Sequence, residues 1–522
     1  MVRDSTRPET PPRTPLASVA AWLDATVRGD AADVEVSGVS LSSQRIRPGD
    51  LYAALPGARA HGIDFLEAAL AAGAVAVLTD PAGADAAGTD VPVLVVDEPR
   101  AVLGRLAARL YDEPATAMRM IGVTGTQGKT TTTRLLESGL AASGVPAAVI
   151  GTVGTRVAGE EVRTTLTTPE APDLHALFAM MRERGVQACA MEVSSHALVM
   201  GRVDGVVFDV AVFLNLGRDH LDFHADVEDY FRAKASLFTP GRARLGLVNV
   251  DDAHGRRLLT ESSVPVRTFS AAGAEADWRA TDVELRADGS TFTVVGPDGR
   301  SFPAGCPLPG DFNVANTLAA VAAAGEAGLD APAVAARITT GGGVPGRLER
   351  VEAGQDYAVV VDYAHKPDAV EAAIRTLRPL TEGRVIVVLG AGGDRDPGKR
   401  PIMAGIAARL ADLLVVTDDN PRSEDPAQIR AAMLAGVTEG EAIEVGDRRL
   451  AISEAVGRAR PGDIVLIAGK GHETGQEVDG VVHPFDDRQV AREAIVTAGR
   501  AEARSGVREN APGSMEGDGT AR

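Results

Sequence analysis

The sequence contains little cysteine, little lysine, few aromatic residues and no long apolar run. Its 522 residues include only two cysteines, Cys189 and Cys306, which cannot form a disulfide framework. We therefore expect reduced thiols and a cytoplasmic protein. The absence of about 18 consecutive apolar residues argues against a transmembrane helix. The first residues are charged and proline-rich without an apolar segment, so they do not resemble a secretory signal.

The formal net charge of −19 argues against a broad nucleic-acid-binding face, which needs a basic surface. A local cationic pocket for phosphates remains compatible with this charge. We expect small-molecule substrates as partners, no nucleic acid, no membrane insertion, and a monomer.

Lysine is scarce even among the basic residues, with 48 arginines and five lysines. The lysines are Lys129, Lys234, Lys366, Lys399 and Lys470. Surface charge is thus supplied by arginine, and a retained lysine is a candidate for a site that needs an ammonium group. Chance survival is the alternative.

Short apolar runs alternate with helical stretches along most of the chain, which is typical of an α/β protein with mostly parallel sheets. Antiparallel hairpins are expected over 281–307, and a glycine-rich linker over 341–346. We predict a disordered arm (1–15), a small α/β domain (16–114), a central P-loop-type ATPase domain (115–344), a Rossmann-like doubly wound domain (345–501) and a disordered tail (502–522).

The strongest local motif is the stretch from Gly125 to Thr131, between a predicted strand (119–124) and a predicted helix (129–142). Glycines let backbone N–H groups surround a phosphate, and a helix N-terminus adds a favourable dipole. Lys129 would reach the outer phosphates, and the Thr130 hydroxyl would bind magnesium. Val123 departs from the strict P-loop pattern, and an ordinary glycine-rich turn is the alternative.

Polar residues follow two further predicted strands of the central domain. Glu192 ends the strand 188–193, and Asn215 to Asp222 follow the strand 209–215. Carboxylates at such strand ends can hold a hard cation, although solvated strand ends and polar loops are common. Lys234 lies on a predicted helix (226–238) and, from the sequence alone, is a solvated lysine.

Polar stretches also follow the strands of the last domain and should meet at one edge of its sheet. They are 392–396, 418–422 and 469–473, and they contain two arginines and a glutamate suited to a ligand with both carboxylate and ammonium groups. The stretch 362–367 after the domain's first strand is either a nucleotide contact or a plain turn.

These stretches, in this order, resemble the Mur ligases, the ADP-forming amide ligases of peptidoglycan (cell wall) biosynthesis. The resemblance covers about residues 35–498, and Asp419-Asn420-Pro421-Arg422 resembles the signature of the branch that adds meso-diaminopimelate to UDP-N-acetylmuramoyl-L-alanyl-D-glutamate. It implies a UDP-sugar domain, an ATP domain and an amino-acid domain, with ATP as co-substrate, Mg²⁺ as cofactor and an acyl phosphate intermediate.

The resemblance also assigns roles to individual residues. It implies catalytic roles for Lys129, Glu192, His220 and Lys234, and metal binding by Thr130, Glu192, His220 and Lys234 as a carbamate. It implies ATP contacts by Gly125, Thr126, Gln127, Gly128, Lys129, Thr130, Thr131, Asn316, Arg347 and Asp362. Contacts to the UDP-muramoyl-dipeptide fall on Leu41, Ser43, Ala58, Arg59, Ala60, Thr167, Thr168, Ser194 and Arg202. Diaminopimelate contacts fall on Arg395, Asp419, Asn420, Pro421, Arg422, Gly469 and Glu473.

Five positions depart from the family pattern: Ser42, Gln44, Gln127, Met200 and Lys366. Met200 stands where the family carries a glutamine, and a thioether cannot donate a hydrogen bond. Two alternatives stay open at this point. One is a related ligase such as a folylpolyglutamate synthetase, which would lack the diaminopimelate residues; the other is a non-catalytic ATP-dependent switch.

Overall fold

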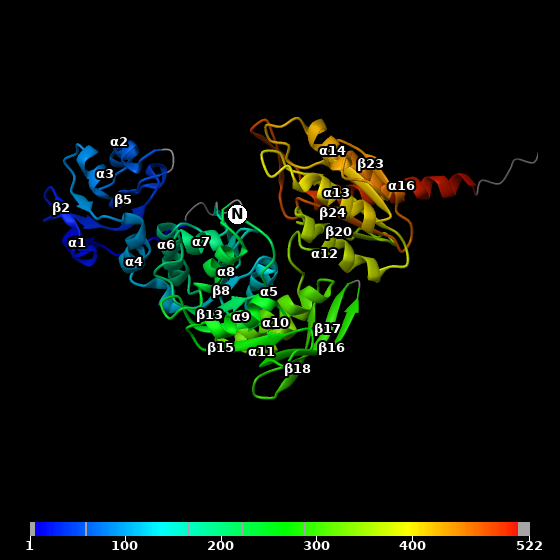
Figure 1. Ribbon diagram of the computed structural model, residues 1–522, viewed down its shortest axis with the longest axis horizontal. Coiled ribbons are helices and arrows are strands. Elements are labelled where there is room, and N and C mark those ends of the chain that lie inside the picture. Colours follow the sequence, from blue (N-terminus) through cyan, green and yellow to red (C-terminus); the bar gives the residue numbers. More distant parts are fainter. Residues whose placement is uncertain (1–5, 58–59, 165, 221–222, 287, 510–522) are drawn as a thin grey trace, which may run out of the picture. The chain divides into compact units, whose positions relative to one another are not determined.

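The computed structural model describes residues 6–57, 60–164, 166–220, 223–286 and 288–509, with burial given through residue 499. The chain divides into two compact units, built mainly from residues up to 342 and from residues 343 onward (Figure 1). No helix within these ranges is both long and apolar enough to cross a membrane.

The first part of the chain forms a five-stranded sheet with strand order β2-β7-β6-β5-β4. Strands β4 to β7 run parallel, and β2 pairs antiparallel with β7 at the edge. Apolar side chains of the strands and helices form two cores. The elements are β2 (Thr26–Arg28), β4 (Gly38–Ser40), β5 (Asp50–Ala54), β6 (Ala76–Thr79), β7 (Val93–Val95), α1 (Leu16–Leu23), α2 (Leu66–Ala71), α3 (Pro81–Ala86) and α4 (Pro99–Leu110).

The central sheet has eleven strands in the order β11-β10-β9-β12-β8-β13-β14-β15-β16-β17-β18. Parallel pairing runs from β9 to β16, and antiparallel pairs flank it on both sides. The strands are β8 (Arg119–Thr124), β9 (Ala147–Ile150), β10 (Thr155–Val157), β11 (Glu160–Val162), β12 (Ala188–Glu192), β13 (Phe208–Phe213), β14 (Ala243–Asn249), β15 (Val266–Ser270), β16 (Trp278–Arg286), β17 (Gly289–Val295) and β18 (Ser301–Cys306).

Helices connect the parallel strands, as expected for βαβ units, and two further helices follow the last strand of the sheet. They are α5 (Lys129–Ala142), α6 (Ala171–Glu183), α7 (Ser195–Val199), α8 (Val227–Ala235), α9 (Ala253–Glu261), α10 (Asp311–Glu326) and α11 (Ala331–Thr339). Several begin on an aspartate whose side chain accepts a hydrogen bond from the first turn, including Asp226, Asp252 and Asp330. Such caps satisfy backbone donors that the helix itself leaves unpaired.

The second unit contains a six-stranded sheet with the order β19-β20-β24-β21-β22-β23, parallel from β20 to β23. Apolar side chains cover both faces. The elements are β19 (Glu349–Arg350), β20 (Ala358–Asp362), β21 (Val385–Ala391), β22 (Leu413–Asp418), β23 (Ala442–Glu444), β24 (Ile464–Ala468), the hairpin β25 (Gly475–Val478) and β26 (Val481–Pro484), α12 (Pro367–Leu377), α13 (Lys399–Leu410), α14 (Pro426–Leu434), α15 (Arg448–Arg458) and α16 (Asp487–Glu509).

Disorder was expected for residues 1–15, of which 1–5 lie outside the described residues, and the remainder differs from this expectation. Arg7 is buried, and its guanidinium donates to Asp50 Oδ2 at 2.6 Å. The backbone N–H groups of Glu9 and Thr10 donate to the Glu183 carboxylate at 2.8 and 3.0 Å. Composition did not reveal this order because the arm's partners lie far away along the chain.

The tail also differs from its predicted disorder near its start. Helix α16 continues to Glu509, so residues 502–509 are helical although their composition predicts disorder. Alanine, glutamate and arginine in this stretch are strong helix formers and extend a helix that is already nucleated.

Candidate active site

Three of the predicted motifs follow three neighbouring strands of the central sheet. Strand β8 pairs in parallel with both β12 and β13, so their carboxyl ends lie at one edge. Gly125 follows β8, Glu192 ends β12, and Asn215 follows β13. The structure therefore brings together the glycine-rich loop, the carboxylate and the polar loop that the sequence singled out.

The loop from Gly125 to Gly128 is held by the side chain of Asn215. Its Oδ1 accepts hydrogen bonds from the backbone N–H groups of Thr126 and Gln127, at 3.2 and 2.9 Å. Its amide nitrogen donates to Gln127 O at 3.2 Å. The sequence placed Asn215 in this region but did not assign it this structural role.

Gly128 begins helix α5 with a φ of 86°, in the left-handed region. A Cβ at this position would lie 2.3 Å from Asn316 Oδ1, on helix α10. Asn316 is itself buried and donates to Asn313 Oδ1 at 3.1 Å. The close approach places Asn316 directly against the loop, and only glycine fits there.

The buried carboxylate of Glu192 lies at the start of α5. Its Oε1 accepts from the Thr130 hydroxyl at 2.9 Å and from Thr152 N at 2.8 Å. Its Oε2 accepts from the Thr152 hydroxyl at 3.1 Å. Thr152 lay in no motif and was not found from the sequence.

The oxygen atoms of Thr130 and Glu192 are the type of donor that a hard divalent cation prefers. The described residues include no cluster of three or more histidine, cysteine, aspartate or glutamate side chains suited to a metal. Thr130 and Glu192 together fit a magnesium ion only if further oxygen ligands complete its coordination.

Two lysines meet at one carbonyl of the loop. Lys129 Nζ donates to Gly125 O at 2.8 Å and to Thr126 O at 3.1 Å. Lys234 Nζ donates to the same Gly125 O at 2.9 Å, from helix α8. Lys234 is 1% exposed, so the expectation of a solvated lysine was wrong. Helical periodicity could not reveal that this face of α8 packs against the loop.

Tyr230 links Lys234 to the loop, although the sequence did not single it out. Its ring centroid lies 4.5 Å from Lys234 Nζ, a cation–π contact. Its hydroxyl lies 3.2 Å from the Thr126 hydroxyl, and burial raises the pKa of the phenol. No residue type or spacing distinguished Tyr230 from an ordinary core aromatic.

His220 lies in a left-handed backbone conformation, with a φ of 53°, in the loop after β13. Its ring packs edge-on against His196, with centroids 4.8 Å apart, and its Nε2 lies 3.4 Å from Asp219 Oδ2. The last two residues of the predicted motif, Leu221 and Asp222, lie outside the described residues.

The residues expected to contact a dipeptide are connected to Glu192. The Thr168 hydroxyl donates to Glu192 O at 2.9 Å, and the Thr167 hydroxyl lies 3.2 Å from that of Thr152. Ser194 caps helix α7 by accepting from Ala197 N. The structure thus joins Thr168 to the backbone of Glu192, links Thr167 to its carboxylate through Thr152, and places Ser194 two residues after it.

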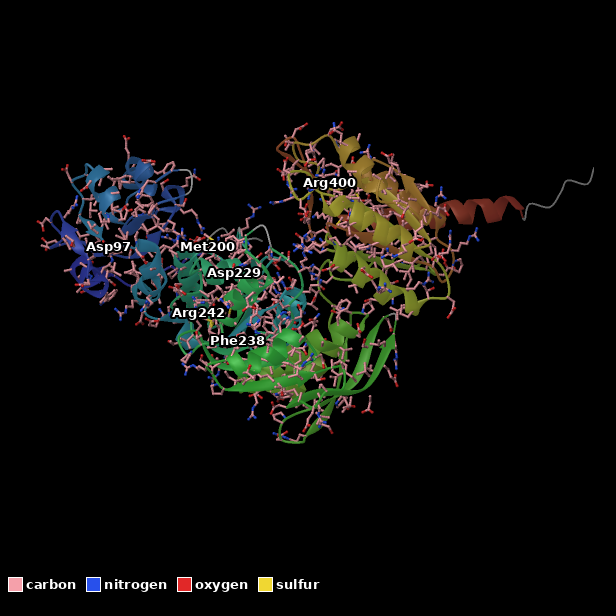
Figure 2. The ribbon with its side chains drawn as sticks, in the orientation of Figure 1. Asp97, Met200, Asp229, Phe238, Arg242 and Arg400 are labelled. Atoms are coloured by element: carbon pink, nitrogen blue, oxygen red, sulfur yellow. The ribbon has the colours of Figure 1, made fainter. Side chains whose placement is uncertain are left out.

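Arg202 forms an ion pair with Glu170, Nε to Oε1 at 2.8 Å. Its Nη2 donates to the sulfur of Met200 at 3.6 Å; Met200 is labelled in Figure 2. The thioether of Met200 therefore acts as a weak acceptor for Arg202.

The expected UDP-sugar contacts in the first domain are only partly described. Leu41 and Ser43 follow β4, and Ala60 is exposed, whereas Ala58 and Arg59 lie outside the described residues. The short helix that begins at Ser43 carries Arg45, which pairs with Asp173 at 2.7 Å.

In the second unit, Asp362 ends β20 and accepts from Leu348 N at 2.8 Å and Ala364 N at 2.9 Å. Burial raises the pKa of Asp362, and the Arg347 charge opposes this rise. The Arg347 guanidinium lies over the Tyr363 ring, 4.7 Å from its centroid. The ATP contacts of Arg347 and Asp362 stay predictions.

The predicted convergence of three polar stretches is present in the second unit. Strand β21 pairs in parallel with β22 and β24, so the loops that follow them share one edge. Gly469, with a φ of 118°, approaches Asp419 so closely that a Cβ would lie 2.5 Å from Oδ2. Asn420 Nδ2 donates to Glu473 Oε2 at 3.0 Å.

Arg422 lies in the left-handed region with a φ of 53°, directly after the buried Pro421. Its Nη1 donates to Gly393 O at 2.6 Å, which ties two of the loops together. Arg395 is exposed on the neighbouring loop. The sequence did not identify Arg400, labelled in Figure 2, which is buried and pairs with Glu424 at 2.8 Å beside these loops.

Comparison with protein families matches most of the chain in three parts. Residues 35–111 match the model described as Mur ligase family, catalytic domain. Residues 123–324 match the Mur ligase middle domain, and residues 346–471 match the Mur ligase, glutamate ligase domain.

Curated relatives extend this similarity over nearly the whole chain. It is 58% identical over 497 residues to the UDP-N-acetylmuramoyl-L-alanyl-D-glutamate--2,6-diaminopimelate ligase of Streptomyces avermitilis, covering 94% of this chain and 98% of that protein. It is 49% identical over 497 residues to the protein of the same name from Corynebacterium glutamicum, covering 91% and 96%.

Solved structures show the same architecture. A structure of a UDP-N-acetylmuramoyl-L-alanyl-D-glutamate--2,6-diaminopimelate ligase is 35% identical, with a TM-score of 0.66, covering 90% of this chain and 97% of that one. A folylpolyglutamate synthase of Mycobacterium tuberculosis is 17% identical, with a TM-score of 0.58, covering 76% and 94%. The second likeness concerns the fold alone.

Proposed function

The chain belongs to the Mur ligase family, and from this premise we propose its reaction. It joins an amine of meso-diaminopimelate to the side-chain carboxylate of D-glutamate in UDP-N-acetylmuramoyl-L-alanyl-D-glutamate, with conversion of ATP to ADP. The observation that carries the proposal is 58% identity to a relative named for this activity, together with the cluster of Asp419, Asn420, Arg422 and Glu473.

The reaction has two steps. An oxygen of the glutamate carboxylate attacks the γ-phosphorus of ATP, the bond to the bridging oxygen breaks, and ADP leaves with both electrons of that bond. The neutral amine then attacks the acyl carbon, the carbon–oxygen bond to phosphate breaks, and the nitrogen loses a proton. Both steps depend on alignment of the reactants and on neutralisation of phosphate charge.

The loop from Gly125 to Thr131 binds the ATP phosphates, and Lys129 pairs with the outer ones. In the structure Lys129 Nζ donates to two loop carbonyls, so ATP would exchange these bonds for phosphate oxygens. Asn316, which contacts Gly128, supports the loop from the side.

Magnesium is held by the Thr130 hydroxyl and the Glu192 carboxylate, whose oxygens fit this ion. When bound, the ion neutralises charge on the transferring phosphoryl group. Lys234, as a carbamate, and His220 would complete this charged region. In the structure Lys234 Nζ makes the contacts of an ammonium, with the Tyr230 ring and Gly125 O, and formation of the carbamate would replace them.

The amino-acid substrate is held in the second unit. The Arg422 fork binds the far carboxylate of diaminopimelate, since its planar donors match a carboxylate. Glu473 takes the amino group of that same end, and Arg395 pairs with the same carboxylate as Arg422. Asp419, Asn420, Pro421 and Gly469 shape the pocket.

The UDP-muramoyl-dipeptide contacts Leu41, Ser43 and residues 58–60 through its UDP-sugar, and Thr167, Thr168, Ser194 and Arg202 through its peptide. We further propose that the protein acts as a monomer in the cytoplasm. A folylpolyglutamate synthetase is less well supported, because its likeness is limited to the fold and the diaminopimelate cluster has no place in it.

The test is ADP release with each substrate omitted in turn, and with a panel of amino acids in place of diaminopimelate. We expect steady ADP formation only with UDP-muramoyl-dipeptide, ATP, magnesium and diaminopimelate together. Rapid ATP hydrolysis without the other substrates would contradict the proposal, and equal turnover with lysine would contradict the assigned amino acid.

A further inference from the structure

Lys470 is a completely buried lysine in a chain that has few lysines. Its side chain is 0% exposed, although it lies in a turn after β24 rather than inside an element. Charged side chains are rarely buried to this extent unless several acceptors surround them. The sequence marked Lys470 as one of five lysines that could serve a site needing an ammonium group and as a member of a glycine-rich turn, without a role for it.

The ammonium of Lys470 is surrounded by residues of the proposed diaminopimelate pocket. Nζ donates to Asn420 Oδ1 at 2.8 Å and lies 3.4 Å from Glu473 Oε2 and 3.6 Å from Asp419 Oδ1. Asn420 also donates to Glu473 Oε2 at 3.0 Å. One ammonium thus connects three side chains that belong to two different loops.

A second buried cation of this unit, Arg448, also acts electrostatically on Asp419 and Glu473 but is bound elsewhere. Arg448, which is also buried, directs Nε and Nη2 to the Asp487 carboxylate at 2.8 and 2.7 Å. Without Lys470, the carboxylates of the buried Asp419 and the partly exposed Glu473 would lose the ammonium that lies within 4 Å of both. Such an arrangement disfavours the ionised form of one carboxylate or moves the two apart.

A lysine suits this position better than an arginine. The ammonium is compact and has three donors, which matches three acceptors in a space without solvent. A guanidinium is wider and planar, so it would push the loops of Asn420 and Glu473 apart.

We propose that Lys470 is a positioning residue for amino-acid recognition: it fixes Glu473 and Asn420 so that the Glu473 carboxylate faces the ammonium group of the incoming substrate. This inference rests on the proposed function, because it assigns Lys470 a role in binding diaminopimelate. Lys470 does not itself touch the substrate.

The test compares Lys470→Met with the wild type in steady-state assays for all three substrates. Loss of one partner of a buried charged pair changes binding by roughly 30-fold or more. We expect the KM for diaminopimelate to rise by that order, while the KM values for ATP and UDP-muramoyl-dipeptide change less than about twofold. Arg449→Met is the matched control, since it removes a cation that pairs with Glu493 on the surface of the same unit.

A double-mutant cycle with Glu473→Gln separates positioning from a general structural role. If Lys470 acts through Glu473, the double variant should have the same KM for diaminopimelate as Glu473→Gln alone, because the two effects are not additive. Additive effects, an unchanged KM for diaminopimelate, or equal shifts in all three KM values would overturn the proposal.

Folding is checked by thermal unfolding of each variant. If Lys470→Met does not fold, the same criteria apply to Lys470→Gln, which keeps a donor for Asn420 without the charge; if neither folds, the role is structural and the proposal is wrong. Failure of the proposed function is distinguishable, because the wild type itself would then not consume diaminopimelate.

Discussion

Arg422 and Glu477 form an ion pair, with 3.3 Å between Nε and Oε2. Their backbones are also joined, since Arg422 N donates to Glu477 O at 3.0 Å. The hairpin β25–β26 therefore supplies a carboxylate to the arginine that is proposed to select the substrate carboxylate. Glu477 would compete with diaminopimelate for this guanidinium.

Removal of this competitor should strengthen substrate binding. Glu477→Gln keeps the backbone bond and the size of the side chain but removes the charge. Partly exposed ion pairs contribute about 0.2–1 kcal/mol, so we expect the KM for diaminopimelate to fall by up to about fivefold. The KM for ATP should not change. An increased KM for diaminopimelate would show that Glu477 supports Arg422 rather than competing for it.

Arg422→Ala should remove selection of the far carboxylate. Loss of a charged hydrogen-bonded partner corresponds to about 2–5 kcal/mol, or roughly 30- to several-thousand-fold in kcat/KM for diaminopimelate. The affinity for ATP should be nearly unchanged, and lysine should remain a poor substrate. Arg375→Ala, which removes an exposed cation paired with Glu371, is the control. A decrease of less than about threefold would exclude Arg422 as the selector.

Lys234→Ala should be nearly inactive. If the lysine acts as a carbamate, short carboxylates such as acetate should partly restore ADP formation. The structure also offers an alternative, because Lys234 Nζ donates to Gly125 O as an ammonium would. Rescue by methylamine but not by acetate would therefore support the ammonium role, and full activity of the unrescued variant would exclude both.

Gly128→Ala should displace the nucleotide loop because a methyl group there meets Asn316. Gly144→Ala is the control, because it has the backbone strain without that contact. Gly128 and Gly144 have similar positive φ values, 86° and 84°, at the two ends of α5. A Cβ at Gly128 would meet Asn316 at 2.3 Å, whereas nothing lies within 4 Å of one at Gly144. In both Gly128→Ala and Gly144→Ala, backbone strain should lower the free energy of unfolding by about 1–2 kcal/mol.

Only the Gly128 variant should also lose ATP turnover, on the order of 100-fold in kcat/KM, because the clash displaces the loop. Chemical unfolding and steady-state kinetics of both variants measure the two effects separately. Equal kinetic losses in both would mean that strain, and not the contact with Asn316, limits the loop.

His175 should contribute to acid sensitivity. It is buried in α6, and burial lowers its pKa to about 4, partly opposed by the carbonyl of Asp204 at 3.0 Å. The unfolded chain takes up the proton near pH 6.5, so it binds more protons than the folded state between pH 6.5 and 4. The contribution of neutral His175 to the free energy of unfolding is therefore fully present above pH 6.5. It decreases towards pH 4, by on the order of 3 kcal/mol.

The measurement is the free energy of unfolding at several pH values for the wild type and His175→Gln. The variant should lose less stability between pH 6.5 and 4, because other titrating groups are common to both proteins. Identical slopes for the two proteins would contradict the assignment.

Local sequence signals predicted the elements that carry the site. The apolar run 119–124 predicted β8 with the bounds that the structure has, and the glycine-rich turn predicted the start of α5 at Lys129. Because parallel strands end at one edge of a sheet, the meeting of the loops after β21, β22 and β24 also followed from the sequence. Periodicity and turn chemistry are local properties, so they can be read without the fold.

Contacts between distant segments were decided only by the tertiary structure. The scarcity of lysine drew attention to Lys234 and Lys470, but only the structure shows that both are buried, Lys234 against Gly125 O and Lys470 against Asn420. Arg7 is ordered by Asp50, 43 residues away. The charge of such a residue is visible in its letter, but its burial and partners depend on how the strands order themselves in the sheets. That order sets which side chain meets which acceptor.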